Sequence, residues 1–161
     1  MIDSAIAFAA TAHAGQRRKY RAVPYIVHPL HVMEIVATVT DNENMWTAAV
    51  LHDVLEDTPV SVQTIERRFG PDVTQMVVGM TKVEVPGNRA IRKAAERDRL
   101  AAEPPEVQTI KVADLIANSY SIIKYDPAFA PLYIGESWEL LAVLTEADQR
   151  LVSQLEEKLR V

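Results

Sequence analysis

The feature that most constrains this chain is a helical stretch, residues 46–57, whose faces are nearly all apolar. Its apolar residues are Ala48, Ala49, Val50, Leu51, Val54 and Leu55. A helix that is apolar all round must be buried, so other elements have to surround it. The sequence therefore predicts a compact core built around this segment, even though its last turns carry polar residues.

The remaining apolar residues follow helical spacing, and no convincing strand pattern appears. Ser61 is typical of an N-cap, Gly70 of the position after a helix, and Pro71 of a first helical residue. The other predicted helices cover about residues 3–16, 30–39, 61–69, 71–81, 89–102, 107–124 and 136–159. We therefore expect an all-α bundle of about seven to eight helices, with a leucine stripe on the last helix that could serve a core or a homodimer.

Length and composition narrow the class of protein. At 161 residues the chain has the size of about one domain, and 48% hydrophobic with 24% charged residues is ordinary globular usage. The apolar runs are far shorter than the roughly 20 residues of a bilayer span, so we expect a cytoplasmic protein without a membrane partner. Because the chain has no cysteine, any metal must be held by His, Asp or Glu.

The charge balance argues against a nucleic-acid partner. The formal net charge is −5, which repels a long polyanion. One local exception is a basic cluster in residues 17–21, where Arg17, Arg18, Lys19 and Arg21 supply four cations. This cluster predicts a patch for a small anionic ligand, although a solvated loop would have the same composition.

Four polar residues interrupt the central apolar segment: His52, Asp53, Glu56 and Asp57. In a helix, Glu56 lies one turn above His52, and Asp57 lies one turn above Asp53. Burying several carboxylates together is costly unless a cation neutralises them. A divalent metal ion would neutralise them. The alternative is that His52 is a core histidine with ordinary hydrogen-bond partners and that the acidic residues lie at an exposed helix end.

Two further segments carry buried-looking polar residues. Asp114 and Asn118 share one face of an apolar helix, at positions i and i+4. His28 follows Pro24-Tyr25-Ile26-Val27 and precedes Pro29, which places it at the start of a helix. Three separate helical segments could thus supply side chains to one site.

The order and spacing of these motifs resemble the HD-domain metal-dependent phosphohydrolases, and within them the hydrolase domain of the RelA/SpoT family. The likeness is to its small stand-alone alarmone hydrolases, of the metazoan SpoT-homologue type, and covers about residues 9–118. Its motifs are Ala12-His13-Ala14-Gly15-Gln16-Arg17-Arg18-Lys19, Pro24-Tyr25-Ile26-Val27-His28-Pro29-Leu30, Leu51-His52-Asp53 with Glu56-Asp57, Phe69-Gly70, Thr81-Lys82, and Lys111-Val112-Ala113-Asp114 with Asn118.

The resemblance implies a role for each motif. It places the metal ligands at His28, His52, Asp53 and Asp114, and the acidic pair that orients and deprotonates the attacking water at Glu56 and Asp57. It places substrate contacts at Arg18, Lys19, Lys82 and Asn118. Two imidazoles and two carboxylates suit one Mn²⁺ ion, with other divalent ions as alternatives. His31 is not expected to be a ligand, and His13 is expected to pack beside the site.

The resemblance also implies a fold, a substrate and a reaction. We expect one HD-type domain over residues 1–161, with no synthetase or regulatory domain after it. The expected reaction of the stringent-response alarmones is hydrolysis of the 3′-pyrophosphate of guanosine tetra- or pentaphosphate, giving GDP or GTP and pyrophosphate. Two alternatives remain: another nucleotide substrate, such as an adenosine alarmone or NADPH, and a non-catalytic nucleotide-binding or antitoxin-like module.

Overall fold

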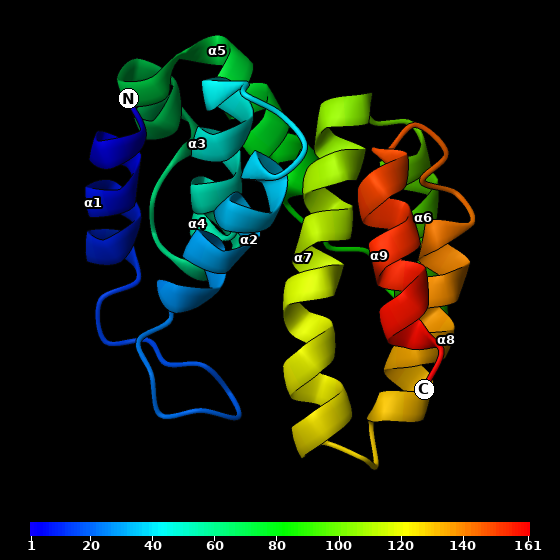
Figure 1. Ribbon diagram of the computed structural model, residues 1–161. Coiled ribbons are helices and arrows are strands. Elements are labelled where there is room, and N and C mark those ends of the chain that lie inside the picture. The colour runs from blue at the N-terminus through cyan, green and yellow to red at the C-terminus, as the bar shows by residue number, and fades with distance from the viewer. The chain divides into compact units, whose positions relative to one another are not determined.

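The computed structural model describes residues 1–161, and its secondary structure is entirely helical apart from one isolated bridge between Arg17 and Pro24. Nine helical segments follow one another along the chain, and one of them, α4, is only four residues long (Figure 1). They are α1 (Ile2–Ala12), α2 (Val27–Ala37), α3 (Glu43–Leu51), α4 (Val54–Asp57), α5 (Val62–Met80), α6 (Arg89–Ala101), α7 (Pro105–Tyr125), α8 (Ala130–Leu141) and α9 (Gln149–Leu159). The all-α prediction is confirmed.

The chain divides into two compact units, Met1–Thr81 and Lys82–Val161. In the first unit α3 is the central helix, and α1, α2 and α5 pack against it. Thr47 and the four residues after it are completely buried, as an all-apolar surface requires. This confirms the buried segment, but the structure ends α3 at Leu51 and begins α4 at Val54, so His52 and Asp53 form a junction between two helices.

Local signals explain the ends of α5. The Ser61 side chain accepts a hydrogen bond from the Thr64 backbone, as an N-cap does. Gly70 has φ +86° and ψ 171°, a conformation open almost only to glycine, and Pro71 then starts a new helical stretch. The segment α5 is therefore two helices joined at a kink, as the Gly-Pro pair predicts.

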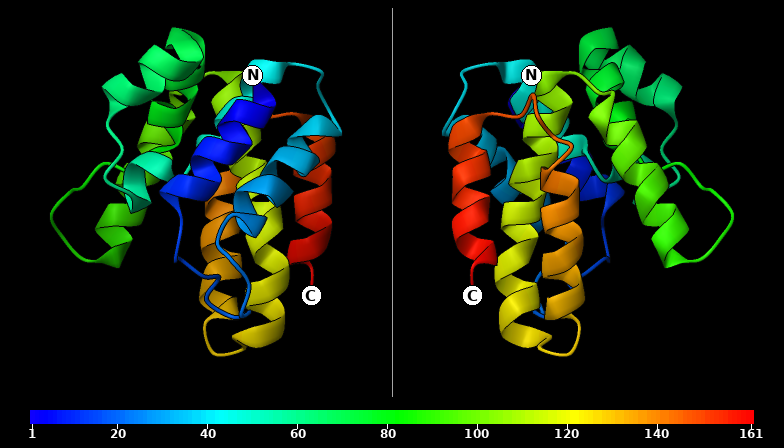
Figure 2. Two further views of the ribbon diagram at one scale, coloured as in Figure 1. Left: turned by 90° about the vertical axis from the view of Figure 1, so that its left-hand side faces the viewer. Right: turned by 90° about the vertical axis from the view of Figure 1, so that its right-hand side faces the viewer.

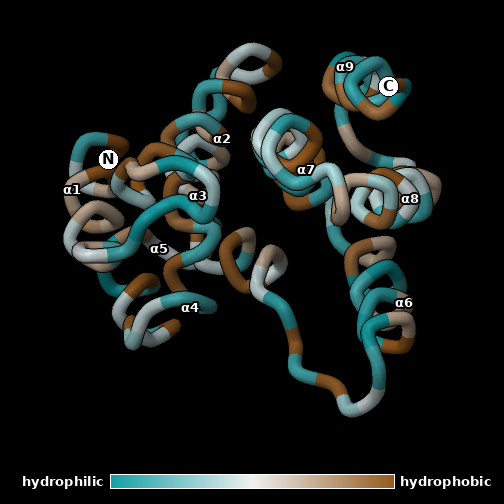
Figure 3. The backbone as a smooth tube through the Cα atoms, turned by 90° about the horizontal axis from the view of Figure 1, so that it is seen from below, coloured by the Kyte–Doolittle hydropathy of each residue, from teal (hydrophilic) through white to brown (hydrophobic).

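In the second unit α7 is the central helix, and it carries buried residues along most of its length. The helices α6, α8 and α9 pack against it, with α8 and α9 running alongside (Figure 2). The leucine stripe of the C-terminal region is buried at Leu144, Leu151, Leu155 and Leu159. In contrast, α6 is strongly hydrophilic, and Leu100 is its one buried residue (Figure 3).

The predicted single helix over residues 136–159 is wrong. The structure has two helices there, and α8 starts at Ala130, with Pro131 in its first turn, where proline costs no hydrogen bond. The chain between them is held by α7, because Glu146 donates its backbone N–H to Gln108 and Asp148 donates to Thr109. These contacts replace the helical hydrogen bonds that a continuous helix would have made. None of the nine helices has the length and apolar character needed to cross a bilayer.

Candidate metal centre

His28 lies in the first turn of α2, at the position that the flanking prolines predict. The chain enters this helix from a loop that is tied back by a 2.9 Å hydrogen bond from the Tyr25 backbone N–H to the Gln16 carbonyl. The His28 side chain is only 4% exposed.

His52 caps the end of α3, and its ring has a defined orientation. Its Nδ1 lies 2.7 Å from the carbonyl oxygen of Ala49. Because a carbonyl can only accept, Nδ1 carries a proton, which leaves Nε2 as the ring atom available to a metal ion. This arrangement is the usual one for a histidine that ligates a metal through Nε2.

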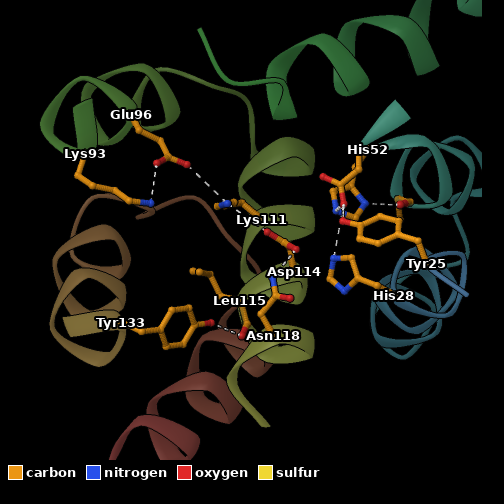
Figure 4. Close-up of polar contacts among 12 residues, drawn as sticks. Tyr25, His28, His52, Lys93, Glu96, Lys111, Asp114, Leu115, Asn118 and Tyr133 are labelled. Atoms are coloured by element: carbon orange, nitrogen blue, oxygen red, sulfur yellow. Dashed lines mark hydrogen bonds and ion pairs between the residues drawn. The ribbon is translucent and has the colours of Figure 1, made fainter. Parts of the chain in front are cut away.

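Both imidazoles converge on Asp53, the residue between α3 and α4. The Asp53 Oδ2 atom lies 3.0 Å from Nε2 of His52 and 3.7 Å from Nε2 of His28. The two histidine rings are 5.2 Å apart, centroid to centroid. Two imidazole nitrogen atoms thus lie within 3.7 Å of one carboxylate oxygen, a donor set that suits a divalent ion. Figure 4 shows the side chains of His28 and His52 next to each other, with Tyr25 beside them.

Tyr25 was not predicted to take part, and the structure places it at the centre of this cluster. Its hydroxyl donates a 2.6 Å hydrogen bond to Asp53 Oδ2, and its ring meets the edge of the His28 ring. Nothing in the chain spacing indicates this contact, because the two residues are 28 positions apart. The only sequence signal is that Tyr25 lies within the motif that ends at His28.

His13 and Gln16 form an outer layer behind Tyr25. The His13 ring packs 4.9 Å from the Tyr25 ring, and its Nδ1 lies 2.8 Å from Oε1 of Gln16. The Gln16 amide nitrogen in turn donates to the backbone carbonyl of Asp57 at 2.9 Å. His13 is therefore a buried packing residue, and Gln16 connects the first loop to the acidic end of α4.

The acidic pair lies on α4, which continues from the His52-Asp53 junction. The Asp57 backbone N–H donates to the Asp53 carbonyl at 3.0 Å, so Asp57 lies one helical turn after Asp53. Both Glu56 and Asp57 are exposed residues. Partial desolvation of the carboxyl, followed by the negative charges of Asp53 and Glu56, raises the pKa of Asp57 above its ordinary value.

In the second unit, Asp114 lies in the middle of α7 and is 8% exposed. Both of its carboxylate oxygens are held from the same helix. Lys111 Nζ lies 3.1 Å from Oδ2, and the Asn118 amide donates to Oδ1 at 3.0 Å. Asp114 and Asn118 thus lie on one face of α7, as their i, i+4 spacing predicts, and Lys111 adds a cation that the spacing did not single out.

Lys111 is itself held by a second carboxylate. Its Nζ lies 3.6 Å from Oε1 of Glu96, and Lys93 Nζ lies 3.2 Å from Oε2 of the same residue. Burial would raise the pKa of Glu96, but the charges of Lys111 and Lys93 outweigh it and hold that pKa below its ordinary value. Figure 4 shows the resulting row of alternating charges from Lys93 to Asp114.

The predicted substrate residues are in different surroundings. Arg18 is half-buried, and its guanidinium lies 5.8 Å from the centre of the Tyr25 ring, beside the histidine cluster. Lys19 instead lies over Tyr20, 5.1 Å from that ring. Lys82 lies in the second unit, where it lines a cavity with residues of α6.

His28, His52 and Asp114 are the buried candidates for metal ligands. The HD domain family matches residues 5–118, which is more than two thirds of the chain. This chain belongs to the HD domain family.

Several curated proteins resemble the chain over a part of their length. A probable guanosine-3′,5′-bis(diphosphate) 3′-pyrophosphohydrolase of Synechocystis sp. is 34% identical over 149 residues, 89% of this chain. A guanosine-3′,5′-bis(diphosphate) 3′-pyrophosphohydrolase of Aquifex aeolicus is 35% identical over 73% of this chain. A GTP pyrophosphokinase of Streptomyces coelicolor is 37% identical over 73% of the chain. The matched region spans 20%, 17% and 14% of these relatives.

Two solved structures share the fold. One is described as a metazoan ortholog of SpoT that hydrolyses ppGpp; it is 28% identical, has a TM-score of 0.89, and covers 99% of this chain and 93% of its own. A protein from Listeria monocytogenes EGD-e has a TM-score of 0.73 at 21% identity, covers 88% of this chain and 97% of its own, and shows the fold alone. The chain is thus a homologue of the RelA/SpoT hydrolase domain.

Proposed function

We propose that this protein is a metal-dependent hydrolase that removes the 3′-pyrophosphate of guanosine tetra- or pentaphosphate, with GDP or GTP and pyrophosphate as products. The observation that carries the proposal is the convergence of the His28 and His52 Nε2 atoms on Asp53 Oδ2. Two imidazole nitrogens beside one carboxylate oxygen, with Nδ1 of His52 bound to the Ala49 carbonyl, suit a divalent metal ion. The names and titles of the relatives supply the substrate.

Asp114 is proposed as the fourth ligand. It is a buried carboxylate whose two oxygens are oriented by Lys111 and Asn118, and burial of such a group is favourable only beside cations. The family match at residues 5–118 includes all four proposed ligands. Two imidazoles and two carboxylates without a thiolate favour Mn²⁺ among the divalent ions.

A bound divalent ion would neutralise charge on the phosphoryl oxygens and lower the pKa of a bound water molecule. The chain's own contribution is the acidic pair at the end of α4. Glu56 would position the attacking water, and Asp57 would accept its proton. The raised pKa of Asp57 makes it a stronger base than an ordinary aspartate, which suits this role.

Four residues are proposed to bind the nucleotide. The Arg18 guanidinium lies beside the cluster and has the planar shape that stacks on a purine, while Lys19 supplies a further charge for phosphates. Asn118, one turn from Asp114 on α7, is proposed to contact the nucleoside, and Lys82 a phosphate. The expected substrate is therefore a small nucleotide.

Product analysis tests the proposal. Purified protein loaded with Mn²⁺ is incubated with guanosine tetraphosphate, the corresponding adenosine alarmone and NADPH in parallel, and products are separated by anion-exchange chromatography. We expect GDP and pyrophosphate from the guanosine compound. If products form only from the adenosine alarmone or only from NADPH, that compound is the substrate of the same chemistry instead.

Two variants and a chelation control complete the test. His52→Ala and Asp53→Asn should each abolish turnover and bound metal, because each removes a proposed ligand. His31→Ala serves as the matched control, since it removes a histidine of α2 that is exposed and is not a proposed ligand. Full activity in extensively chelated protein would refute the metal mechanism, and tight binding of the alarmone without any product would favour a non-catalytic module.

A further inference from the structure

We propose that Gln16 is a positioning residue for Asp57, the proposed general base, and that His13 fixes the direction of the Gln16 amide. We call the two side-chain hydrogen bonds of Gln16, to Asp57 and to His13, the Gln16 clamp. The inference rests on the proposed function, and all three residues belong to the first unit. It starts from α4, a single turn of four residues. One turn of helix is unstable by itself, because few hydrogen bonds offset the loss of backbone freedom, so contacts from outside α4 are needed to hold Asp57.

Gln16 provides such a contact at the end of the turn. Its amide nitrogen donates to the backbone carbonyl of Asp57 at 2.9 Å, although the two residues are 41 positions apart. The last carbonyls of a helix have no partner within the helix, and this bond satisfies one of them. The backbone of Gln16 is itself held, since its N–H donates to the His13 carbonyl and its own carbonyl accepts from the Tyr25 N–H. Gln16 thus ties the acidic turn to a hydrogen-bonded loop.

His13 selects which end of the Gln16 amide faces Asp57. The Oε1 atom of Gln16 lies 2.8 Å from Nδ1 of His13. Since an amide oxygen can only accept, Nδ1 is the donor in this bond. In a reversed amide the oxygen atom would meet the Asp57 carbonyl, and both groups only accept. The Nδ1–H group of His13 therefore favours the one orientation in which Gln16 donates to Asp57.

The cost of burying His13 indicates a role beyond packing. His13 is only 2% exposed, and its ring packs against the Tyr25 ring. The second ring nitrogen, Nε2, is buried without a hydrogen-bond partner. Burial of an unpaired polar atom lowers stability, so an apolar side chain would fill this space more favourably. The polar contact that the His13 ring does make is the bond to Gln16, which assigns this ring to the orientation of the amide.

Hydrogen exchange of the metal-free protein, followed residue by residue by NMR, tests the Gln16 clamp without turnover. Gln16→Met keeps the length of the side chain and the net charge but removes both hydrogen bonds. The backbone amides of Asp57 and Thr58, which close the turn of α4, should exchange about two- to tenfold faster, as loss of one ordinary hydrogen bond implies. The matched control is Gln149→Met, which removes a bond of the same kind, from the amide nitrogen to the Ala147 carbonyl at 3.1 Å, in the second unit. It should leave the exchange at α4 unchanged.

Two variants of His13 separate the orientation of the amide from packing. Asparagine carries an amide nitrogen close to the place of Nδ1, whereas leucine has a similar size and no donor. His13→Asn should therefore keep the slow exchange of the wild type at α4, and His13→Leu should exchange as fast as Gln16→Met. Equal exchange in the two His13 variants, or unchanged exchange in Gln16→Met, would overturn the proposal. A melting curve of each variant confirms that it is folded.

Kinetics of the Mn²⁺-loaded enzyme connect the Gln16 clamp to the reaction. In Gln16→Met, kcat should fall by about tenfold, because a displaced base accepts the proton of the attacking water poorly. The KM and the Kd for Mn²⁺ should stay within about twofold of the wild-type values, since no proposed ligand or substrate contact is lost. An unchanged kcat together with faster exchange would also overturn the proposal. A wild-type protein that hydrolyses no alarmone would refute the proposed function, whereas faster exchange in Gln16→Met would still support the clamp on Asp57.

Discussion

The hydrogen bond from Tyr25 to Asp53 offers the sharpest test of the metal centre. Tyr25→Phe removes only the hydroxyl and keeps the ring that packs against His28 and His13. The Asp53 carboxylate then loses the donor that orients Oδ2, the atom on which both imidazoles converge. The affinity of the protein for Mn²⁺ should therefore fall, because the Asp53 carboxylate must be both ionised and oriented to bind the ion.

The geometry of the bond sets the size of this effect. At 2.6 Å it is as short as charge-assisted O–H···O⁻ bonds are, and the Asp53 side chain is only 17% exposed. Hydrogen bonds to charged groups contribute about 1.5–3 kcal/mol. Loss of a partner that orients a ligand typically lowers metal affinity by about 10- to 100-fold, or roughly 1.4–2.7 kcal/mol. The two ranges agree, so we expect the Kd for Mn²⁺ to rise by at least about tenfold.

Calorimetric titration of Mn²⁺ into metal-free protein measures the change directly. Tyr120→Phe is the matched control, since it also removes a hydrogen-bonded phenol, but from an exposed tyrosine of α7 whose hydroxyl accepts from Lys124. Its Kd should stay within about twofold of the wild-type value, because the lost bond is exposed. An unchanged Kd in Tyr25→Phe would refute the reasoning that Asp53 is a ligand oriented by Tyr25.

Three further predictions concern stability. Gly70→Ala should lower the free energy of unfolding by about 1–3 kcal/mol, whereas Gly135→Ala, inside α8 with similar open space, should raise it by about 0.5–1 kcal/mol; urea unfolding measures both, and equal signs would contradict the strain at φ +86°. Asp57→Asn should stabilise the metal-free protein at pH 7, since the raised pKa of Asp57 makes its ionised form unfavourable in the fold. This gain in stability should vanish as the pH falls below the pKa of Asp57 in the unfolded state. Melting curves measured across pH test this, and a gain that does not change with pH would show that the explanation is wrong. Gln108→Leu should lower the free energy of unfolding by about 2–4 kcal/mol, because it leaves the Glu146 N–H and the Glu103 carbonyl without their partner; a melting temperature close to that of the wild type would disprove this.

The helix ends show where sequence reasoning succeeds. The Ser61 cap and the Gly70 kink both follow from sterics and hydrogen bonds within a few residues. The C-terminal region shows where it fails, because residues 136–159 carry an uninterrupted leucine stripe that is compatible with one helix. The break depends on Gln108 and Thr109, which lie 38 and 39 residues before their partners.

The same division holds within the candidate site. His28, His52, Asp53 and Asp114 could be singled out from the chain as polar residues in apolar segments, which are rare and costly, and the family resemblance then implied their role as ligands. Tyr25 could not, because a phenol near a histidine motif has many structural uses.

The amino-acid sequence by itself determined the helical class, most helix boundaries and the donor types that a metal would need. These properties depend on periodicity, capping and side-chain chemistry, all of which act over one or two helical turns. Tertiary structure alone decided that Tyr25 orients Asp53, that Ala49 selects the His52 tautomer and that α8 and α9 are separate. Each of these depends on a lone pair or an N–H meeting a partner at about 3 Å, and the folded path of the chain sets such distances.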